Sequence, residues 1–410
     1  MAVMGRREFL REAGKVCVAA FMLGVERNGL VRAMGDGGVE ADVMFGNLRE
    51  GEVNVNLFEE QEVKLQLKAQ EGRYTPGFRV WQADDGEDKD AHLVMVDNGR
   101  VLNGQLRVGE KIYRFWPQPG GRVLIGEDTR RMTPESEKVV PLDELRARFP
   151  GETKALIKGS VLEGESNGLP VVKVGLVFDG TAQAYYGSSE VMESEGALTV
   201  AVGNGMFEAS GVNARQALGY SGPLDYDSTG KVPDEVWRDM VWIEGMEFKW
   251  LDKLRRIRDS YALDQVVVVI DSPAQWSGMA YQGGDPNRPW GADAQFALVN
   301  AHVGPLGRQH ELGHETGFCH DHETDVNGCY GATPAAFGYV GSDFSTEMAY
   351  PDVGTPWVER ISSSVMLYDG EATGVAGYAD NAEAGNFALP IIARYRLDVL
   401  YRLLLPLVVR

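Results

Sequence analysis

The sequence predicts two folded parts in one chain, a small antiparallel β domain followed by a larger α/β (α+β) domain. Two observations predict this division. In residues 40–130, short runs alternate apolar and polar side chains with a period of two, as half-buried strands do. From residue 171 onward, strand-like runs alternate with segments of helical periodicity, which favours a sheet covered by helices. A chain of 410 residues is long enough for two or three domains with separate cores.

The composition is that of a globular protein with an acidic excess. Asp and Glu number 60 against 40 Lys and Arg, which gives a formal net charge of −20. Nucleic acids and anionic membranes bind clustered Lys and Arg, so this balance argues against both as partners. Internal repeats and long low-complexity tracts are absent from the sequence.

Residues 1–33 resemble an export signal of the twin-arginine type. The segment Gly5–Arg11 contains two adjacent arginines and precedes an apolar stretch, Val16–Val25, that is too short to span a bilayer. The resemblance implies an exported protein, periplasmic or extracellular, that loses this segment. Val31–Ala33 is a candidate cleavage site, and a buried amphipathic helix is the alternative interpretation.

Residues 40–130 are predicted to form the β domain. Runs such as Val53–Leu57 and Val63–Leu67 have strand periodicity, and turn sequences such as Asp97-Asn98-Gly99 separate the runs. The region contains no catalytic combination of residues. It is therefore either a removable N-terminal segment or a permanent adhesion or substrate-binding module.

Residues 131–170 are rich in charge, Pro and Gly, and this composition predicts a linker. Exposed basic residues in a linker are candidate sites for proteolytic processing. They are Arg130, Arg131, Arg146, Arg148 and Lys158.

Residues 171–410 are predicted to form the α/β domain. Gln265–Ile270 is apolar along almost its whole length, as a strand buried on both faces would be. A strand at Phe296–Val303 is expected to lead into a helix through Gly304-Pro305. The other expected elements are a strand at Val172–Phe178, a helix at Ser189–Phe207 with Ser189 as N-cap, a strand at Asn213–Tyr220 and a helical region at 234–260.

The motif with the clearest chemistry starts at His310 and reads His-Glu-Leu-Gly-His-Glu-Thr-Gly-Phe-Cys-His. On a helix, His310 and His314 leave the same face one turn apart. Gly317 can end that helix and reverse the chain, which lets His320 reach the same metal ion. Three neutral imidazoles suit Zn²⁺ and leave a fourth position for a water molecule, which Glu311 can deprotonate.

This H-E-x-x-H-x-x-G-x-x-H pattern resembles the signature of the metzincin zinc metallopeptidases, which continues to a turn containing methionine. The segment Ser364-Val365-Met366-Leu367-Tyr368 has the S-x-M-x-Y form of that turn in several metzincin families. The resemblance implies a catalytic domain with a twisted mixed sheet and an active-site helix. It also implies that Met366 forms an apolar floor under the zinc, that Tyr368 binds the oxyanion or packs, and that Ser364 and Asp321 lie behind the ligands.

Within the metzincins, the sequence is most similar to bacterial reprolysin (adamalysin)-like peptidases that carry an N-terminal propeptide. Asp321 follows the third histidine, and a β domain precedes the catalytic one. The resemblance implies a zymogen whose propeptide is the β domain. It also implies that Ser277–Tyr281 leads into an edge strand over the cleft, where an extended substrate can pair. Glu315-Thr316 differs from the Asn-Leu of reprolysins, and Gly317-Phe318 is similar to astacins and serralysins, so the subfamily stays open.

The three cysteines include one, Cys17, inside the predicted signal. Cys319 and Cys329 then remain in an exported chain, where a disulfide is the economical interpretation. Cys319 as a fourth zinc ligand is the less favoured alternative, because it would close the site. The predicted propeptide has no cysteine, so it cannot inhibit the enzyme by placing a thiolate on the metal. Any inhibition by the propeptide must therefore be steric.

These inferences predict a secreted zinc endopeptidase that hydrolyses protein or peptide substrates with a zinc-bound water activated by Glu311. A non-catalytic zinc-containing cell-surface binding protein is one alternative. A protease dedicated to processing one partner is another. The apolar run Leu397–Val409 is interrupted by Asp398, Arg402 and Pro406, so no membrane span is expected in the mature chain.

Overall fold

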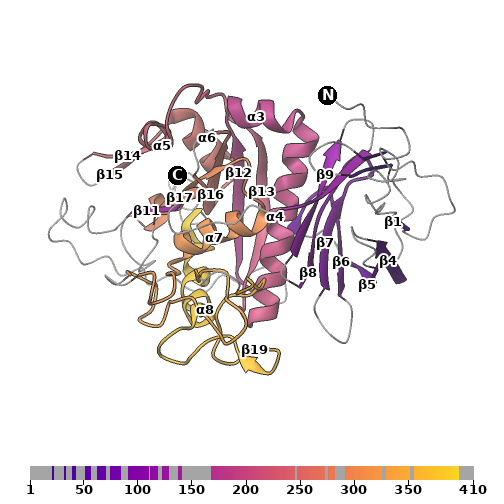
Figure 1. The fold of residues 1–410 in the computed structure, drawn as a ribbon. Coiled ribbons are helices and arrows are strands. Elements are labelled where there is room, and N and C mark those ends of the chain that lie inside the picture. Colours follow the sequence, from indigo (N-terminus) through magenta and orange to yellow (C-terminus); the bar gives the residue numbers. More distant parts are fainter. Residues whose placement is uncertain are drawn as a thin grey trace, which may run out of the picture. The chain divides into compact units, whose positions relative to one another are not determined.

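The protein is described by a computed structural model. It describes residues 21–22, 32–33, 39–42, 51–56, 62–70, 74–84, 91–109, 111–118, 122–128, 137–140, 168–244, 247–272, 276–281, 291–325, 329–350 and 355–396. The chain divides into two compact units, Met1–Thr129 and Arg130–Arg410. In Figure 1, the strands of the first unit are indigo to purple, and the second unit runs from magenta to yellow. Among the described residues, none of the helices has the length and apolar character needed to cross a bilayer.

The first unit contains a ten-stranded antiparallel sheet in the order β1-β4-β5-β6-β7-β8-β9-β10-β3-β2. From β4 to β10 each strand pairs with the next one along the chain, as antiparallel strands separated by only a few residues do. The apolar side chains of one face form a core that includes Leu65, Trp81, Leu93 and Phe115. The strands are β3 (Val39–Asp42), β4 (Gly51–Asn56), β5 (Glu62–Gln70), β6 (Arg79–Asp84), β7 (Ala91–Asp97), β8 (Leu102–Val108), β9 (Lys111–Gln118) and β10 (Arg122–Glu127).

Residues 1–33 are predicted to be an export signal that is not part of the fold. Two short strands of the sheet nevertheless lie in this segment. Strand β1 (Phe21–Met22) pairs with β4, and strand β2 (Arg32–Ala33) pairs with β3. These pairings satisfy main-chain groups at the two edges of the sheet. The rest of the predicted signal lies outside the described residues.

The second unit contains a six-stranded mixed sheet in the order β11-β17-β18-β16-β12-β13, in which only β17 and β18 pair antiparallel. Every residue of β16 is buried, as the apolar run predicts for a strand covered on both faces. The strands are β11 (Glu137–Val140), β12 (Val171–Phe178), β13 (Arg215–Pro223), β16 (Gln265–Ile270), β17 (Gly278–Tyr281) and β18 (Phe296–Asn300). The longer helices are α4 (Ser189–Ser210), α7 (Pro305–Thr316) and α8 (Asn381–Ile392), and a short α3 (Gly180–Tyr186) follows β12.

Three local expectations differ from the structure. The region 234–260 is not continuously helical, because a hairpin of β14 (Val241–Glu244) and β15 (Glu247–Trp250) separates α5 (Pro233–Met240) from α6 (Asp252–Ser260). Its β-branched and aromatic residues favour strands. The N-cap of α4 is Ser188, whose hydroxyl accepts a hydrogen bond from the Val191 amide (3.2 Å), so the predicted Ser189 is the first helical residue.

The third difference lies in the predicted linker, residues 131–170. Four of its residues form β11, which pairs in parallel with β17 of the second unit. Main-chain pairing with a distant strand leaves little trace in local composition, which explains why charge, Pro and Gly predicted only a linker. The segment therefore contributes to the sheet of the second unit.

Helix α7 is buried at all twelve of its residues and packs against α4, β17 and β18 (Figure 1). Arg308 of this helix forms a buried ion pair with Glu195 of α4, at 2.6 Å, and donates to the Tyr186 hydroxyl at 2.6 Å. Gln309 donates to the carbonyl oxygen of Thr199 at 2.8 Å. Separating a buried ion pair is costly because it leaves a buried charge without its partner. These contacts therefore hold α7 against α4.

Candidate metal centre

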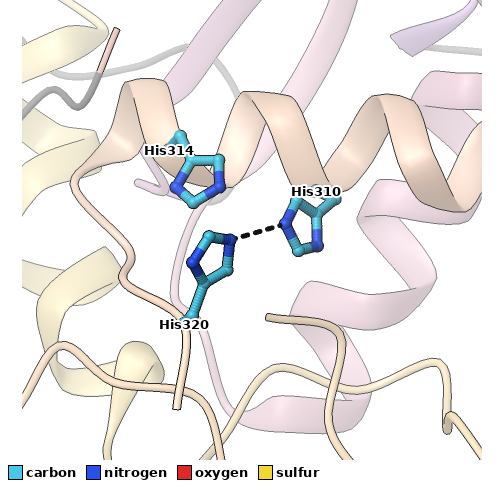
Figure 2. A group of neighbouring side chains, drawn as sticks. All are labelled: His310, His314 and His320. Atoms are coloured by element: carbon cyan, nitrogen blue, oxygen red, sulfur yellow. Dashed lines mark hydrogen bonds between the residues drawn. The ribbon is translucent and has the colours of Figure 1, made fainter. Parts of the chain in front are cut away.

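The first two predicted ligands, His310 and His314, lie on the same face of α7, and their ring centroids are 4.9 Å apart. The helix ends at Gly317, which has φ 93° and ψ 27°, a left-handed conformation that glycine adopts without steric cost. The chain then reverses and brings His320 back towards the helix (Figure 2). The local sequence thus places the three histidines together.

The three rings converge closely enough to share one ion. One ligand atom from each histidine lies within 4.8 Å of the others, and all three side chains are buried. His310 Nε2 and His320 Nε2 are 3.3 Å apart (Figure 2). Tetrahedral zinc with bonds of about 2.0–2.1 Å requires nitrogens roughly 3.3–3.4 Å apart. The histidines therefore fit Zn²⁺ in donor type and in this spacing.

The Nδ1 atom of each histidine faces an oxygen. His310 Nδ1 is 2.9 Å from the carbonyl oxygen of Glu347, and His314 Nδ1 is 3.0 Å from that of Phe318. A carbonyl oxygen only accepts, so both Nδ1 atoms carry the hydrogen and both Nε2 atoms keep a lone pair. Such outer contacts fix the tautomer and orientation of metal-binding histidines.

The third oxygen belongs to Asp325, which lies outside the sequence motif. Its Oδ1 lies 3.3 Å from His320 Nδ1, and its Oδ2 accepts a hydrogen bond from the His320 amide at 3.0 Å. A carboxylate behind a metal-binding histidine raises the basicity of the ring. The only sequence signal was an acidic residue shortly after the last ligand of the motif.

Glu311, the predicted general base, is buried on α7 and lies against strand β17. A Cβ added at Gly278 would collide with the Glu311 carboxylate. Glycine at this position therefore makes room for the carboxylate between the helix and the strand. The contact also locates β17 at the border of the histidine site.

The predicted methionine turn at Ser364–Tyr368 is corrected by the structure. In the described contacts, Met366 lies against Gly211 at the end of α4 and the Tyr368 ring packs on Phe344, with ring centroids 5.2 Å apart. The amide of Ser364 donates to Asp380 at 3.1 Å. None of these contacts involves a histidine, so the segment belongs to the packing of the C-terminal part.

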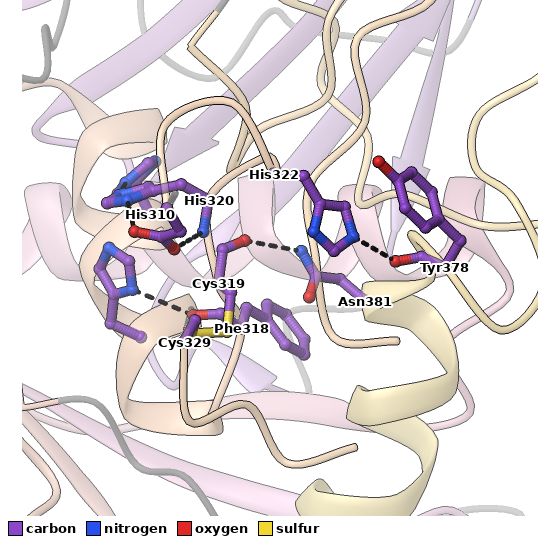
Figure 3. Close-up of a disulfide and its surroundings, with 10 residues drawn as sticks. His310, Phe318, Cys319, His320, His322, Cys329, Tyr378 and Asn381 are labelled. Carbon is purple, nitrogen blue, oxygen red and sulfur yellow. Dashed lines mark hydrogen bonds and ion pairs between the residues drawn. A yellow bond between two sulfur atoms is a disulfide. The ribbon is translucent and has the colours of Figure 1, made fainter. Parts of the chain in front are cut away.

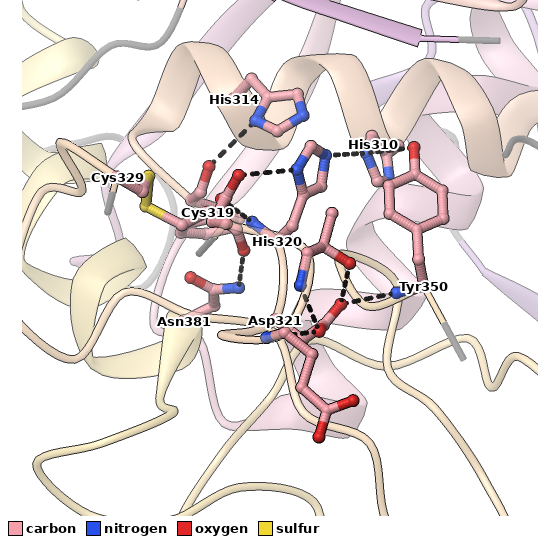
Figure 4. Close-up of polar contacts among 12 residues, drawn as sticks. His310, His314, Cys319, His320, Asp321, Cys329, Tyr350 and Asn381 are labelled. Atoms are coloured by element: carbon pink, nitrogen blue, oxygen red, sulfur yellow. Dashed lines mark hydrogen bonds and ion pairs between the residues drawn. A yellow bond between two sulfur atoms is a disulfide. The ribbon is translucent and has the colours of Figure 1, made fainter. Parts of the chain in front are cut away.

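Met348 and Tyr350 occupy the places expected for Met366 and Tyr368. The Met348 sulfur lies against Gly313, the residue before His314. The Tyr350 ring centroid is 4.9 Å from that of His320, and its hydroxyl is 3.4 Å from His310 Nε2 (Figure 4). The same M-x-Y spacing occurs in both segments. The repeated spacing made both segments candidates for the methionine turn. The burial of Met348 distinguishes its segment from the other.

Asp321 connects the third ligand to the segment that contains Tyr350. Its Oδ2 accepts from the Tyr350 amide at 2.9 Å (Figure 4). The same oxygen accepts from the Thr324 hydroxyl at 2.8 Å. Its Oδ1 accepts from the amide of Glu323 at 3.0 Å. Asp321 thus orders the chain around Tyr350, as expected for a residue behind the ligands.

A disulfide joins Cys319 to Cys329 with a Cα–Cα distance of 6.0 Å (Figure 3). Both sulfurs are engaged in this bond, which excludes the alternative of Cys319 as a fourth ligand. His322, two residues after the last ligand, is stacked between Phe337 and Tyr378, with ring centroids 3.7 and 4.0 Å away. The His322 ring therefore packs between two aromatic side chains of the segments that follow α7.

Two further carboxyl groups are buried near the histidines. Burial raises the pKa of Glu315 well above its usual range. Burial also raises the pKa of Glu347 well above its usual range, and the nearby Glu359 adds to this effect. Burial thus favours the neutral form of both carboxyl groups.

Comparison with curated protein sequences finds a relative of known activity. The chain is 28% identical over 311 residues to a peptidyl-Asp metalloendopeptidase of Xanthomonas campestris pv. campestris, and the match covers 72% of this chain and 68% of the relative. No protein-family model matches. The relative is a metalloendopeptidase, and the chain described above has a three-histidine site.

Similarity to solved structures is weak. A chaperone–substrate complex matches 71% of this chain and 39% of the solved chain, with 15% identity and a TM-score of 0.42. This chain thus spans less than half of that structure. Metalloproteinase-II from Bacteroides fragilis matches 70% of this chain and 87% of the solved chain, with 13% identity and a TM-score of 0.38.

Proposed function

We propose that the protein is a zinc-dependent endopeptidase of the metzincin type, similar to reprolysin-like enzymes. The observation that carries the proposal is the convergence of three histidines whose Nδ1 atoms all face oxygens, with Glu311 beside them. The relative named as a metalloendopeptidase supports the same reaction class. Three histidines in such a site leave room for one more ligand, which catalysis needs.

Zinc, when bound by His310, His314 and His320, would polarise the scissile carbonyl group and acidify a water molecule. Glu311 takes the proton from the attacking water and passes it to the leaving amine nitrogen. Its carboxylate is buried between α7 and β17. The Tyr350 hydroxyl, 3.4 Å from His310 Nε2, is positioned to donate to the developing oxyanion.

The substrate class in this proposal is an extended peptide that lies along β17. The relative's name specifies peptidyl-Asp bonds, and we extend the preference for Asp to this chain. Two peptides that differ only by Asp or Asn at one position test this extension. We expect kcat/KM to be at least about tenfold higher for the Asp peptide. This ratio corresponds to a difference of about 1.4 kcal/mol in activation free energy. Equal rates would remove Asp from the proposal.

The proposal also includes export from the cytoplasm, which the twin-arginine pattern and the Cys319–Cys329 disulfide favour. Replacing both Arg6 and Arg7 by Lys should leave the protein in the cytoplasmic fraction of a producing cell. Unchanged export of that variant would contradict the twin-arginine interpretation.

The central test is Glu311→Gln, which keeps the size of the side chain and removes the base. The proposal expects bound zinc to remain equimolar while cleavage of casein falls by at least about a hundredfold, the lower range for general acid–base catalysis. Glu323→Gln, an exposed residue of the loop after His320, is the matched control and should retain parental activity.

Two results would overturn the assignment. Parental activity in Glu311→Gln would remove this residue as the base. A parent chain with confirmed zinc and no cleavage sensitive to phenanthroline would instead favour the zinc-containing binding protein.

A further inference from the structure

A second cluster of metal-ligand atoms lies beside the three histidines and consists of Cys319, Asp325 and Cys329. The two sulfur atoms and one carboxylate oxygen all lie within 4.8 Å of one another. Cys319 is fully buried, whereas Cys329 and Asp325 are partly exposed. In the described structure the two sulfurs are bonded to each other (Figure 3). The disulfide therefore occupies the place where two thiolates and a carboxylate would otherwise meet.

The partial exposure of Cys329 gives an external dithiol access to this disulfide. A thiolate of the dithiol attacks the Cys329 sulfur, and Cys319 leaves as a thiolate. The second thiol of the dithiol then displaces Cys329 from the mixed disulfide. The reductant becomes a disulfide, and its two electrons and two protons convert the pair in the chain to two thiols.

The reduced pair and Asp325 have the chemistry of a zinc site. Thiolates are preferred ligands of zinc, and carboxylate oxygens also bind it. Zinc–sulfur bonds are about 2.3 Å long, so two sulfurs on one tetrahedral ion lie about 3.8 Å apart. The Cα atoms of the two cysteines are 6.0 Å apart, which lets staggered side chains reach this sulfur spacing. A water molecule can fill the fourth position.

Asp325 connects this cluster to the histidine site. Its Oδ1 lies 3.3 Å from His320 Nδ1, and its Oδ2 accepts from the His320 amide at 3.0 Å. A metal ion on the carboxylate competes with one of these two contacts. Binding at the two sites is therefore coupled, and each ion weakens the binding of the other by the same factor.

We propose that reduction of the Cys319–Cys329 disulfide creates a second zinc site, formed by the two thiolates and the Asp325 carboxylate. Each thiol gives its proton to water when it binds the ion. In the reverse direction, the two thiolates pass two electrons to an external disulfide, their own bond forms, and zinc is released beside His320. The site does not depend on the proposed peptidase function, because Glu311 and peptide have no part in it.

The first experiment counts zinc ions in the full chain with Glu311→Gln, which prevents self-digestion. One sample keeps the disulfide, and the other is reduced by a water-soluble phosphine, which adds no competing thiol, and is desalted under nitrogen. Both are dialysed at the same free zinc concentration before metal analysis. The reduced chain should bind one more ion per chain than the oxidised chain.

The second experiment identifies the ligands with Co²⁺ in place of zinc. Thiolates on cobalt produce intense charge-transfer absorption in the near ultraviolet, so the reduced chain should show this band and the oxidised chain should not. The double variant Cys319→Ser, Cys329→Ser is the matched control, because it lacks the disulfide and both thiolates. It should bind no additional ion under reducing conditions and show no band.

The third experiment tests the carboxylate in the reduced chain. Asp325→Asn should keep the charge-transfer band but bind the additional ion at least about tenfold more weakly, because a neutral amide replaces a charged ligand. Asp343→Asn changes an exposed aspartate and should keep the parental affinity for the additional ion. Parental affinity in Asp325→Asn would overturn the assignment of Asp325 as a ligand.

Three results would overturn the second site as a whole. One is an equal number of zinc ions in the reduced and oxidised chains. Another is an additional ion without the charge-transfer band, or an additional ion in the double serine variant, since either result places the ion elsewhere. The last is loss of the near-ultraviolet circular dichroism signal on reduction, because the site needs the fold that holds Asp325 beside the cysteines.

Discussion

Asp325→Ala should weaken zinc binding without removing a ligand. Asp325 makes two contacts with His320, at 3.3 Å to Nδ1 and at 3.0 Å to the amide, so its loss removes one contact from the ring and one from the backbone of the third ligand. Removal of such an outer partner typically lowers metal affinity by about 10- to 100-fold, or roughly 1.4–2.7 kcal/mol. We expect the upper part of this range, because one side chain makes both contacts.

The assay is equilibrium competition for zinc against a chromophoric chelator, which does not depend on catalysis. Asp325→Asn retains one carbonyl oxygen and should lose less affinity than Asp325→Ala, because a single acceptor can still face His320. Asp343→Ala, an exposed aspartate in the same part of the chain, is the control. Parental zinc affinity in Asp325→Ala would refute the argument that this carboxylate orients the third ligand.

Two other predictions concern the reaction and the fold. Tyr350→Phe should lower kcat by about a hundredfold with unchanged zinc affinity, as for the loss of an oxyanion donor, and an unchanged kcat at saturating peptide would exclude that role. Burial raises the pKa of Asp264 to about 7 from 3.8. The folded state therefore retains a proton that the unfolded state releases between pH 4 and 7, and the free energy of unfolding falls as pH rises, by up to about 1.4 kcal/mol per unit. Urea titrations at pH 5 and 7 should show a smaller fall for Asp264→Asn, and an identical fall would contradict the prediction.

The histidine cluster could be predicted from sequence because local geometry creates it. His310 and His314 are one helical turn apart, and Gly317 provides the left-handed residue at which the chain reverses. These relations depend on spacing and on the conformational freedom of glycine, both of which are visible in the sequence. The buried strand β16 was predictable for a similar reason, since its apolar run is continuous.

The methionine turn was not predictable, because the sequence offers two segments with the same spacing. Met366 is flanked by Val365 and Leu367, which are 77% and 58% exposed, whereas Met348 is buried. Which segment reaches the helix depends on the path of the chain between them. That path is set by long-range packing, so the motif alone could not decide.

Strand pairing across long stretches of sequence was equally hidden. The residues of β11 have no strong strand pattern, and their partner β17 lies more than a hundred residues further along the chain. Main-chain hydrogen bonds supply the pairing, and they place few demands on side chains. The β14–β15 hairpin was missed for a different reason, because its strand-forming residues lie between two segments that favour helix.

The three ligands differ in how firmly the fold orients them. The carbonyl oxygens that face His310 and His314 belong to Glu347 and Phe318, and both of these residues are buried. The oxygen that faces His320 belongs to a carboxylate with a 22% exposed side chain, located between the cysteines of the disulfide loop. Backbone oxygens of packed segments move less than the side chain of a loop residue. His320 is therefore the ligand whose orientation depends most on its surroundings, and variation in the loop should change metal affinity more than variation along α7 outside the motif.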